Sequence, residues 1–96
     1  MVVLVCQFDL HLMERPSSLK GKRHVVRSLK DRIRNKFGVA VAEVGSQDLL
    51  HRCALGIAGV SESQDALEPA VERIRSLIEG DGSVEIIQEA VYFERY

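Results

Sequence analysis

The sequence lacks the features that mark secreted, membrane-spanning or strongly charged proteins. Only two of its 96 residues are cysteines, too few for a secreted domain that depends on disulfides. No apolar run approaches the roughly 18 residues that a membrane-spanning helix needs. The apolar N-terminal stretch has no basic start and carries Gln7 and Asp9, which is unlike a signal peptide. The net charge of −1 provides no overall field for nucleic acid or membranes.

What is present is typical of one globular domain. Hydrophobic residues make up 46% of the chain and charged residues 28%, which is neither a disordered nor a fibrous composition. A chain of 96 residues leaves no room for a second core. We therefore expect a single soluble, cytoplasmic domain over residues 1–96, without a membrane partner.

Hydrophobic periodicity predicts a strand and then a helix in the first part of the chain. Residues 2–13 alternate between a uniformly apolar set and a mixed set, the pattern of a half-buried strand. Between Leu19 and Phe37 the apolar residues recur at spacings of seven, three, four and four, which predicts a helix with one buried stripe. Ser18 is a suitable N-cap, and Gly38 suits the left-handed residue that ends a helix.

The rest of the chain reads as two short strands, a second helix and a long final strand. Residues 39–44 and 53–60 are the short strands, and residues 83–96 form a strand long enough to bend or carry a bulge. Residues 61–65 break the chain and offer two candidate capping pairs, Ser61 with Gln64 and Asp65 with Glu68. The second helix follows this break and runs to about Glu79. Pro69 is expected in its first turn, because deeper inside it would remove a hydrogen bond.

The predicted element order is therefore βαββαβ. With right-handed crossovers, this order gives an α+β fold of the ferredoxin-like type: a four-stranded antiparallel sheet in the order 4-1-3-2, with both helices on one face.

The small net charge hides an uneven distribution. Residues 14–36 hold nine basic residues against two acids, or +7, whereas residues 61–96 hold nine acids against three arginines, or −6. Within the predicted first helix, five cations recur every three or four residues and form one continuous basic ridge: Lys20, Arg23, Arg27, Lys30 and Arg34. We include Lys22, near the helix start, with this basic ridge as a candidate nucleic-acid-binding residue.

Five like charges at these spacings repel one another, so negative charge should face the basic ridge. In one interpretation the chain itself supplies the acids, from the last strand or from Glu68, Glu72 and Glu79 of the second helix. In another, water alone surrounds the ridge. Alternatively the negative charge belongs to RNA or another polyanion, or to an acidic protein or membrane surface. The position of the three glutamates in the folded chain distinguishes an internal match from an external partner.

Motifs for metals and cofactors are absent. No histidine has a second ligand at metal-binding spacing; the three are His11, His24 and His51. Cys6 and Cys53 occupy core positions on strands expected to be neighbours and could approach each other, but without a C-x-x-C motif we expect buried thiols rather than a redox pair. We therefore expect no metal and no cofactor.

Catalytic motifs are absent as well. There is no G-x-S-x-G nucleophile elbow, and no serine is accompanied by a second catalytic motif. The one arrangement that would indicate an enzyme is a pocket at the sheet edge that gathers Asp9, His11 and Glu43. We expect no enzymatic activity and no catalytic residues, and an enzyme with a site at the sheet edge is the weakest alternative.

One face of the predicted sheet carries small and apolar residues: Val3, Val5, Ala54, Gly56 and Ala58. An uncovered face with so few charges indicates a surface for a partner, and self-association through it is one hypothesis. The alternative is that the C-terminal strand, with Tyr92 and Tyr96, covers it. Recognition of RNA by stacking bases on the sheet is disfavoured, because residues 53–59 of the third strand include no aromatic residue.

Several segments together resemble the YlxP-like family of small bacterial proteins of unknown function. They are Ser18-Leu19-Lys20-x-Lys22-Arg23, Val26-x-Ser28-Leu29-Lys30-x-Arg32, Lys36-Phe37-x-Val39, Val41-Ala42-Glu43-Val44 and Leu55-Gly56-Ile57-Ala58. The resemblance covers nearly the whole chain and implies a ferredoxin-like fold. The genes of this family often lie beside those for a translation initiation factor and a ribosome-binding factor, which implies a link to translation or ribosome maturation. The family supplies no catalytic residues to carry over.

Two hypotheses follow. In the first, the chain is a non-enzymatic module that contacts structured RNA or the ribosome, its lysines and arginines neutralising phosphates without reading sequence. In the second, it is a structural module that forms homo-oligomers through the open sheet face. One version of this hypothesis adds regulation by a small ligand.

Overall fold

Six elements follow one another in the predicted order, and the computed structural model describes all residues from 1 to 96. They are β1 (Val2–Leu12), α1 (Leu19–Phe37), β2 (Ala40–Gly45), β3 (Arg52–Ser61), α2 (Gln64–Gly80) and β4 (Val84–Arg95). The predicted boundaries lie within one or two residues of these, apart from the start of α2.

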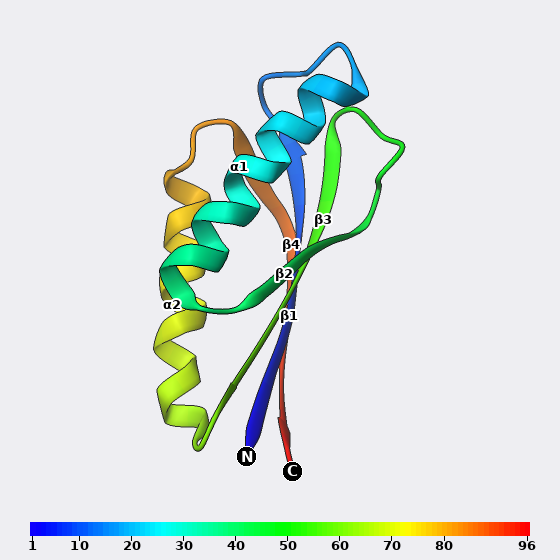
Figure 1. Ribbon diagram of the computed structural model, residues 1–96. Helices are drawn as coiled ribbons and strands as arrows, with labels where there is room; N and C mark the ends of the chain where they lie inside the picture. Colours follow the sequence, from blue (N-terminus) through cyan, green and yellow to red (C-terminus); the bar gives the residue numbers. More distant parts are fainter.

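The strands form one antiparallel sheet in the order β2-β3-β1-β4, which confirms the ferredoxin-like α+β fold. Figure 1 shows the sheet nearly edge-on, with α1 and α2 on the same side of it. The two chain ends lie together, because Met1 and Tyr96 exchange backbone hydrogen bonds of 2.9 and 2.8 Å. The other face of the sheet carries no helix.

The core lies between the sheet and the two helices. Six alternate residues of β1 are at most 1% exposed, which confirms the predicted apolar face: Val2, Leu4, Cys6, Phe8, Leu10 and Leu12. They pack with the buried stripe of α1 and with Leu67, Val71, Ile74 and Ile78 of α2. The register of β4 shifts opposite Asp9 and Leu10, which is the predicted irregularity in the long last strand.

The helix ends follow local side-chain chemistry. Ser18 Oγ accepts a hydrogen bond of 3.1 Å from the Gly21 amide, and Gly38 ends α1 with a φ of +63°, both as predicted. The start of α2 differs from the prediction, because Ser63 is the N-cap and Pro69 is the sixth residue of the helix. The missing Pro69 amide leaves one carbonyl near the start of α2 without its helical donor. Neither helix is long and apolar enough to cross a membrane.

The two cysteines do not meet. Cys6 lies opposite Ile57 in the β1–β3 register, whereas Cys53 lies opposite Leu10, four residues further along β1. Four residues of strand correspond to about 13 Å, so the idea that the two thiols approach each other is wrong. Both are free and buried in the core. Burial raises the pKa of Cys6 to about 11 and that of Cys53 to about 12.

Candidate nucleic-acid interface

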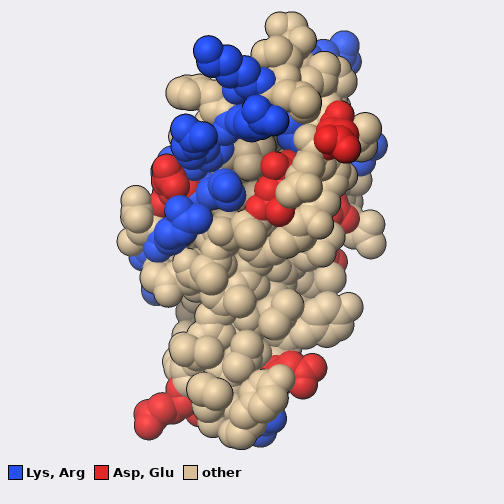
Figure 2. All heavy atoms as spheres, turned by 45° about the vertical axis from the view of Figure 1, so that its right-hand side comes forward, with Lys and Arg blue, Asp and Glu red and all other residues tan.

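The basic ridge lies on the outer side of α1, beside edge strand β2. Four of its side chains are exposed and Lys30 is half-buried. Figure 2 shows lysine and arginine atoms gathered on the upper half of this face, with only a few acidic atoms among them. The i+3 and i+4 spacing in the sequence thus produces a real cluster of positive charge on the folded surface.

A groove runs between α1 and β2 along this ridge. It has a volume of about 400 Å³, and Arg23, Arg27 and Lys30 line it from the helix. From the sheet side its lining includes Ala42, Glu43 and Gln47. Three ridge cations therefore border one concave surface, with Glu43 as the acidic residue among its lining residues.

Little of the ridge charge is neutralised within the chain. Arg34 pairs with Asp31 at 3.0 Å and also donates a hydrogen bond of 3.2 Å to the carbonyl of Val41 on β2. The other four cations have no acidic partner within 4.0 Å: Lys20, Arg23, Arg27 and Lys30.

The acids of α2 are directed to other partners. Glu72 pairs with Arg75 at 2.7 Å, and Glu68 accepts a hydrogen bond of 2.8 Å from Gln64. Glu79 makes no ion pair with the ridge. The internal match that the sequence allowed is therefore not made by these three glutamates.

Lys22 must be removed from the set of candidate binding residues. Its side chain is 2% exposed, and its Nζ lies 3.0 Å from Glu43 Oε2. The same ammonium group donates hydrogen bonds of 2.6 and 3.3 Å to the carbonyls of Ser46 and Gln47. The Lys22–Glu43 contact is an ion pair without hydrogen-bond geometry, so Glu43 Oε2 accepts no hydrogen bond. Lys22 holds the loop after β2 against α1 and does not face a partner.

The sequence contained a signal for this burial. The apolar stripe of α1 leaves a gap of seven residues between Leu19 and Val26, and Lys22 lies in that gap at the buried phase of the helix. A cation at that phase requires a buried acid from another element. Glu43 lies 21 positions away along the chain, and only the packing of β2 against α1 brings it there.

The residues considered for catalysis lie apart. Asp9 lines a pocket on the open sheet face, Glu43 lines the groove beside α1, and His11 lines neither. No group of three or more histidine, cysteine or acidic side chains is placed to hold a metal ion. The structure thus offers no pocket that gathers Asp9, His11 and Glu43.

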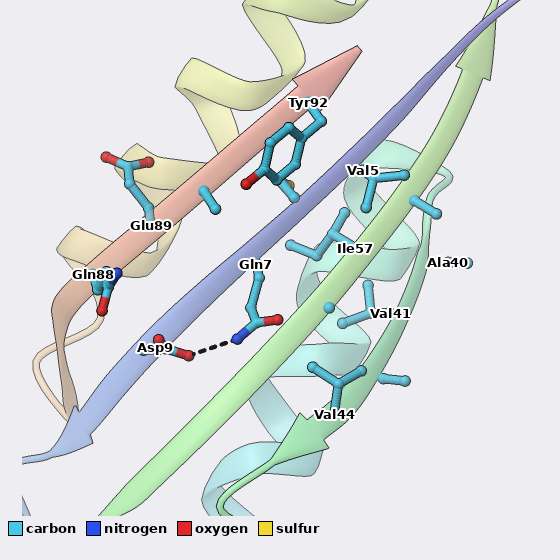
Figure 3. Close-up of a pocket in the computed structure, with 15 residues that line it drawn as sticks. Val5, Gln7, Asp9, Ala40, Val41, Val44, Ile57, Gln88, Glu89 and Tyr92 are labelled. Carbon is cyan, nitrogen blue, oxygen red and sulfur yellow. Dashed lines mark hydrogen bonds between the residues drawn. The ribbon is translucent and has the colours of Figure 1, made fainter. Parts of the chain in front are cut away.

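The sheet face opposite the helices carries a hollow of about 570 Å³. Figure 3 shows it between Tyr92 of β4 and the valines of β2, with the amide of Gln7 donating a hydrogen bond of 3.0 Å to Asp9 in its floor. A Cβ on Gly56 would lie 2.7 Å from a methyl group of Val44. Glycine therefore allows Val44 of the edge strand to lie against the sheet.

The expected composition of this face needs one correction. Ala54 lies on it but is only 5% exposed, so it adds little to the accessible surface. Val5 and Ala58 are exposed, and Val3 and Gly56 are half-buried. The C-terminal strand does not cover them, because β4 is an edge strand paired with β1.

Two comparisons with known proteins agree with the family resemblance of the sequence motifs. A family model described as "Protein of unknown function (DUF503)" matches residues 3–91. The chain belongs to this family. It is also 38% identical over 68 residues to a Bacillus subtilis (strain 168) protein described as "Uncharacterized protein YlxP", covering 71% of this chain and 74% of the relative. The predicted resemblance is confirmed. Neither description assigns an activity, so the site must be interpreted from its own chemistry.

Proposed function

We propose that this member of the DUF503 family is a non-enzymatic binding module that contacts structured RNA through the basic ridge of α1, with the RNA of a ribosomal subunit as the expected partner. One observation carries the proposal: Lys20, Arg23, Arg27 and Lys30 stand on one helix face without an acidic partner within 4.0 Å. A chain of net charge −1 thus concentrates unpaired positive charge in one place.

The dimensions of the ridge suit a phosphate backbone. Fourteen residues separate Lys20 from Arg34, and at about 1.5 Å per residue the ridge extends about 21 Å. Arginine and lysine side chains over that length can reach several successive phosphates, and binding releases the counterions condensed on the nucleic acid. Such contacts position the protein without reading sequence. We therefore expect recognition of RNA shape and charge rather than of a sequence motif.

The sheet is a poorer candidate for the RNA-binding surface. Protein modules that bind single-stranded RNA on a similar sheet stack bases on aromatic residues of the central strands. Here the outward-facing residues in the middle of the two central strands are not aromatic: Val5, Gln7, Asp9, Ala54, Gly56 and Ala58. This favours the helix side of the molecule for contact with RNA.

The test is binding to purified small ribosomal subunits and to a control duplex RNA across a salt series. About four phosphate contacts predict a slope of roughly −3 in log affinity against log salt. The variant Arg23→Glu/Arg27→Glu should lose subunit binding, because two attractive contacts become repulsive.

A matched control reverses the same number of charges elsewhere. Arg73 on α2 and Arg95 on β4 are exposed and make no ion pair, so Arg73→Glu/Arg95→Glu changes net charge equally without touching the ridge. This control should bind the subunit nearly as well as the unmodified chain. The proposal fails if both double variants bind equally, or if subunits bind no more tightly than the control duplex.

The second hypothesis, self-association through the open sheet face, concerns a different surface. Because that face and the basic ridge lie on different sides of the molecule, the two properties can coexist and can be tested separately.

A further inference from the structure

The open sheet face presents large apolar side chains to solvent although the chain has a well-formed core on the other side. Val5 is 45% exposed and Tyr92 is 61% exposed, and both border the hollow of about 570 Å³. Val44 and Val60 are also exposed. A contiguous apolar patch of this kind on a single chain is typical of an interaction surface.

The registers of the sheet show how large and small side chains are distributed over the middle of this face. Strand pairing places Tyr92, Val5, Ala58 and Ala40 in one row across the four strands. The next row contains Ala90, Gln7, Gly56 and Ala42. In the first row the bulkier side chains, Tyr92 and Val5, belong to β4 and β1, and the alanines belong to β3 and β2. In the second row Gln7 of β1 is the one large side chain. Figure 3 shows the ring of Tyr92 standing at one border of the hollow.

We propose that the partner of this face is a second copy of the same chain, related by a two-fold axis parallel to the strands. This rotation leaves the position of each row along the strands unchanged. It reverses the order of the strands across the sheet in the second copy relative to the first. It places β4 over β2 of the second copy and β1 over β3, so that Tyr92 lies over the alanines of β2. In the row through Tyr92 the large half of each chain then meets the small half of the other, and in the next row Gln7 meets Gly56. The pairing is closed because the same patch is used twice.

The charges on the face fit the same arrangement. Asp9 on β1 and Arg52 on β3 point to this face one row apart in the register, and neither forms an ion pair within its own chain. With β1 over β3 of the second copy, Asp9 of each chain comes next to Arg52 of the other. The two-fold axis makes this contact twice, which complements the apolar middle with a polar rim.

The area is sufficient for a specific dimer. β1 and β3 pair over ten residues, and the six residues of β2 cover as many of β4 in the second copy. At about 3.3 Å per residue and 4.8 Å between strands, the overlap has a projected area of roughly 500 Å². Side-chain relief raises the accessible area above the projection, toward the roughly 800 Å² per partner of a standard interface. The basic ridge stays outside this contact, so a dimer presents two ridges to RNA.

Sedimentation velocity on the full chain, from about 1 to about 500 μM, tests the proposal. We expect a concentration-dependent dimer whose dissociation constant rises at least tenfold in Ala58→Glu, which places a charge in the centre of the face. Ala66→Glu on α2 is the matched control, because Ala66 is exposed and lies away from the sheet. Circular dichroism of each variant confirms that it is folded.

A charge swap tests the orientation. Asp9→Arg and Arg52→Asp should each weaken the dimer, and the double variant should restore it, because the two side chains then attract again with reversed sign. A strict monomer at the highest concentration overturns the proposal, as does a dimer that Ala58→Glu leaves unchanged. A monomer whose hollow binds the fluorescent probe ANS, with binding lost in Ala58→Glu, also overturns it in favour of a small-ligand pocket. Arg23→Glu/Arg27→Glu should leave dimerisation intact, which separates this result from the RNA proposal.

Discussion

Replacing Lys22 by methionine should destabilise this protein far more than replacing any lysine of the basic ridge. Methionine fills nearly the same space as the lysine stem but cannot pair with Glu43. The change removes an ion pair of 3.0 Å and hydrogen bonds to two loop carbonyls at 2.6 and 3.3 Å. It also leaves the Glu43 carboxylate, whose side chain is only 17% exposed, without its counter-charge.

The magnitude follows from that loss of one partner. Breaking a buried ion pair by removing one side typically costs 3–5 kcal/mol, because the remaining charge is buried and uncompensated. Partial exposure of Glu43 lets water relieve part of that penalty, so we expect a loss of about 3 kcal/mol for Lys22→Met. That is a large part of the roughly 5–15 kcal/mol by which a small domain is stable.

Urea denaturation followed by far-UV circular dichroism measures the effect. Lys20→Met, on the exposed side of the same helix turn, is the control and should change the unfolding free energy by no more than about 0.5 kcal/mol. Adding Glu43→Gln to Lys22→Met should recover part of the loss, because it removes the uncompensated charge. A cost below about 1 kcal/mol for Lys22→Met, or no recovery in the double variant, would refute the structural role assigned to this pair.

Two further predictions concern the pH dependence of stability. Burial raises the pKa of Cys6 to about 11 and of Cys53 to about 12, from about 9 in the unfolded chain. Because the thiols of the unfolded chain ionise at lower pH than those of the folded chain, the unfolding free energy should fall as pH rises above about 9. The double variant Cys6→Ala/Cys53→Ala should show a smaller fall in urea unfolding. An unchanged pH dependence in this variant would contradict the role given to the two thiols. Partial burial raises the pKa of Asp81, but hydrogen bonds from Ser83 and the nearby Arg32 outweigh it and hold the pKa below its usual range. The ionised Asp81 carboxylate therefore stabilises the fold at neutral pH, and this stabilisation is lost as the group is protonated in acid. In urea unfolding, Asp81→Asn should lower the unfolding free energy by about 1 kcal/mol at pH 7 and by little near pH 2. Equal losses at the two pH values would contradict this role of Asp81.

Much of the candidate interface was predictable from spacing alone. Lys20, Arg23, Arg27, Lys30 and Arg34 share one helix face because their intervals match the helical repeat, whatever the rest of the chain does. Their lack of internal partners was not predictable. It depends on where Glu68, Glu72 and Glu79 point once α2 is packed, and α2 directs them to its own surface and to Arg75.

Lys22 illustrates where spacing alone fails. Because the neighbouring cations of α1 are exposed, Lys22 is expected to be exposed as well. Its place on the buried side of the helix can be interpreted only once the structure shows that Glu43 pairs with it. The position of Pro69 shows a similar limit. The sequence predicts this proline in the first turn of the second helix, but the Ser63 cap starts α2 at Gln64, five residues before Pro69. The predicted approach of the cysteines failed because register along neighbouring strands is a tertiary property that alternation does not determine.

The sequence by itself determined the local structure and the fold class. Alternation in β1, the apolar stripe and caps of α1, and the order of the elements leave few ways to bury the apolar faces, and the ferredoxin-like sheet is the one that results. Tertiary structure alone decided which charges are paired and which side chains share a row of the sheet. The physical reason is sequence separation, because helix and strand periodicity depend on residues only a few positions apart. The Lys22–Glu43 pair and the rows of the open face join residues that are distant along the chain, and these meet only when the strands are in register.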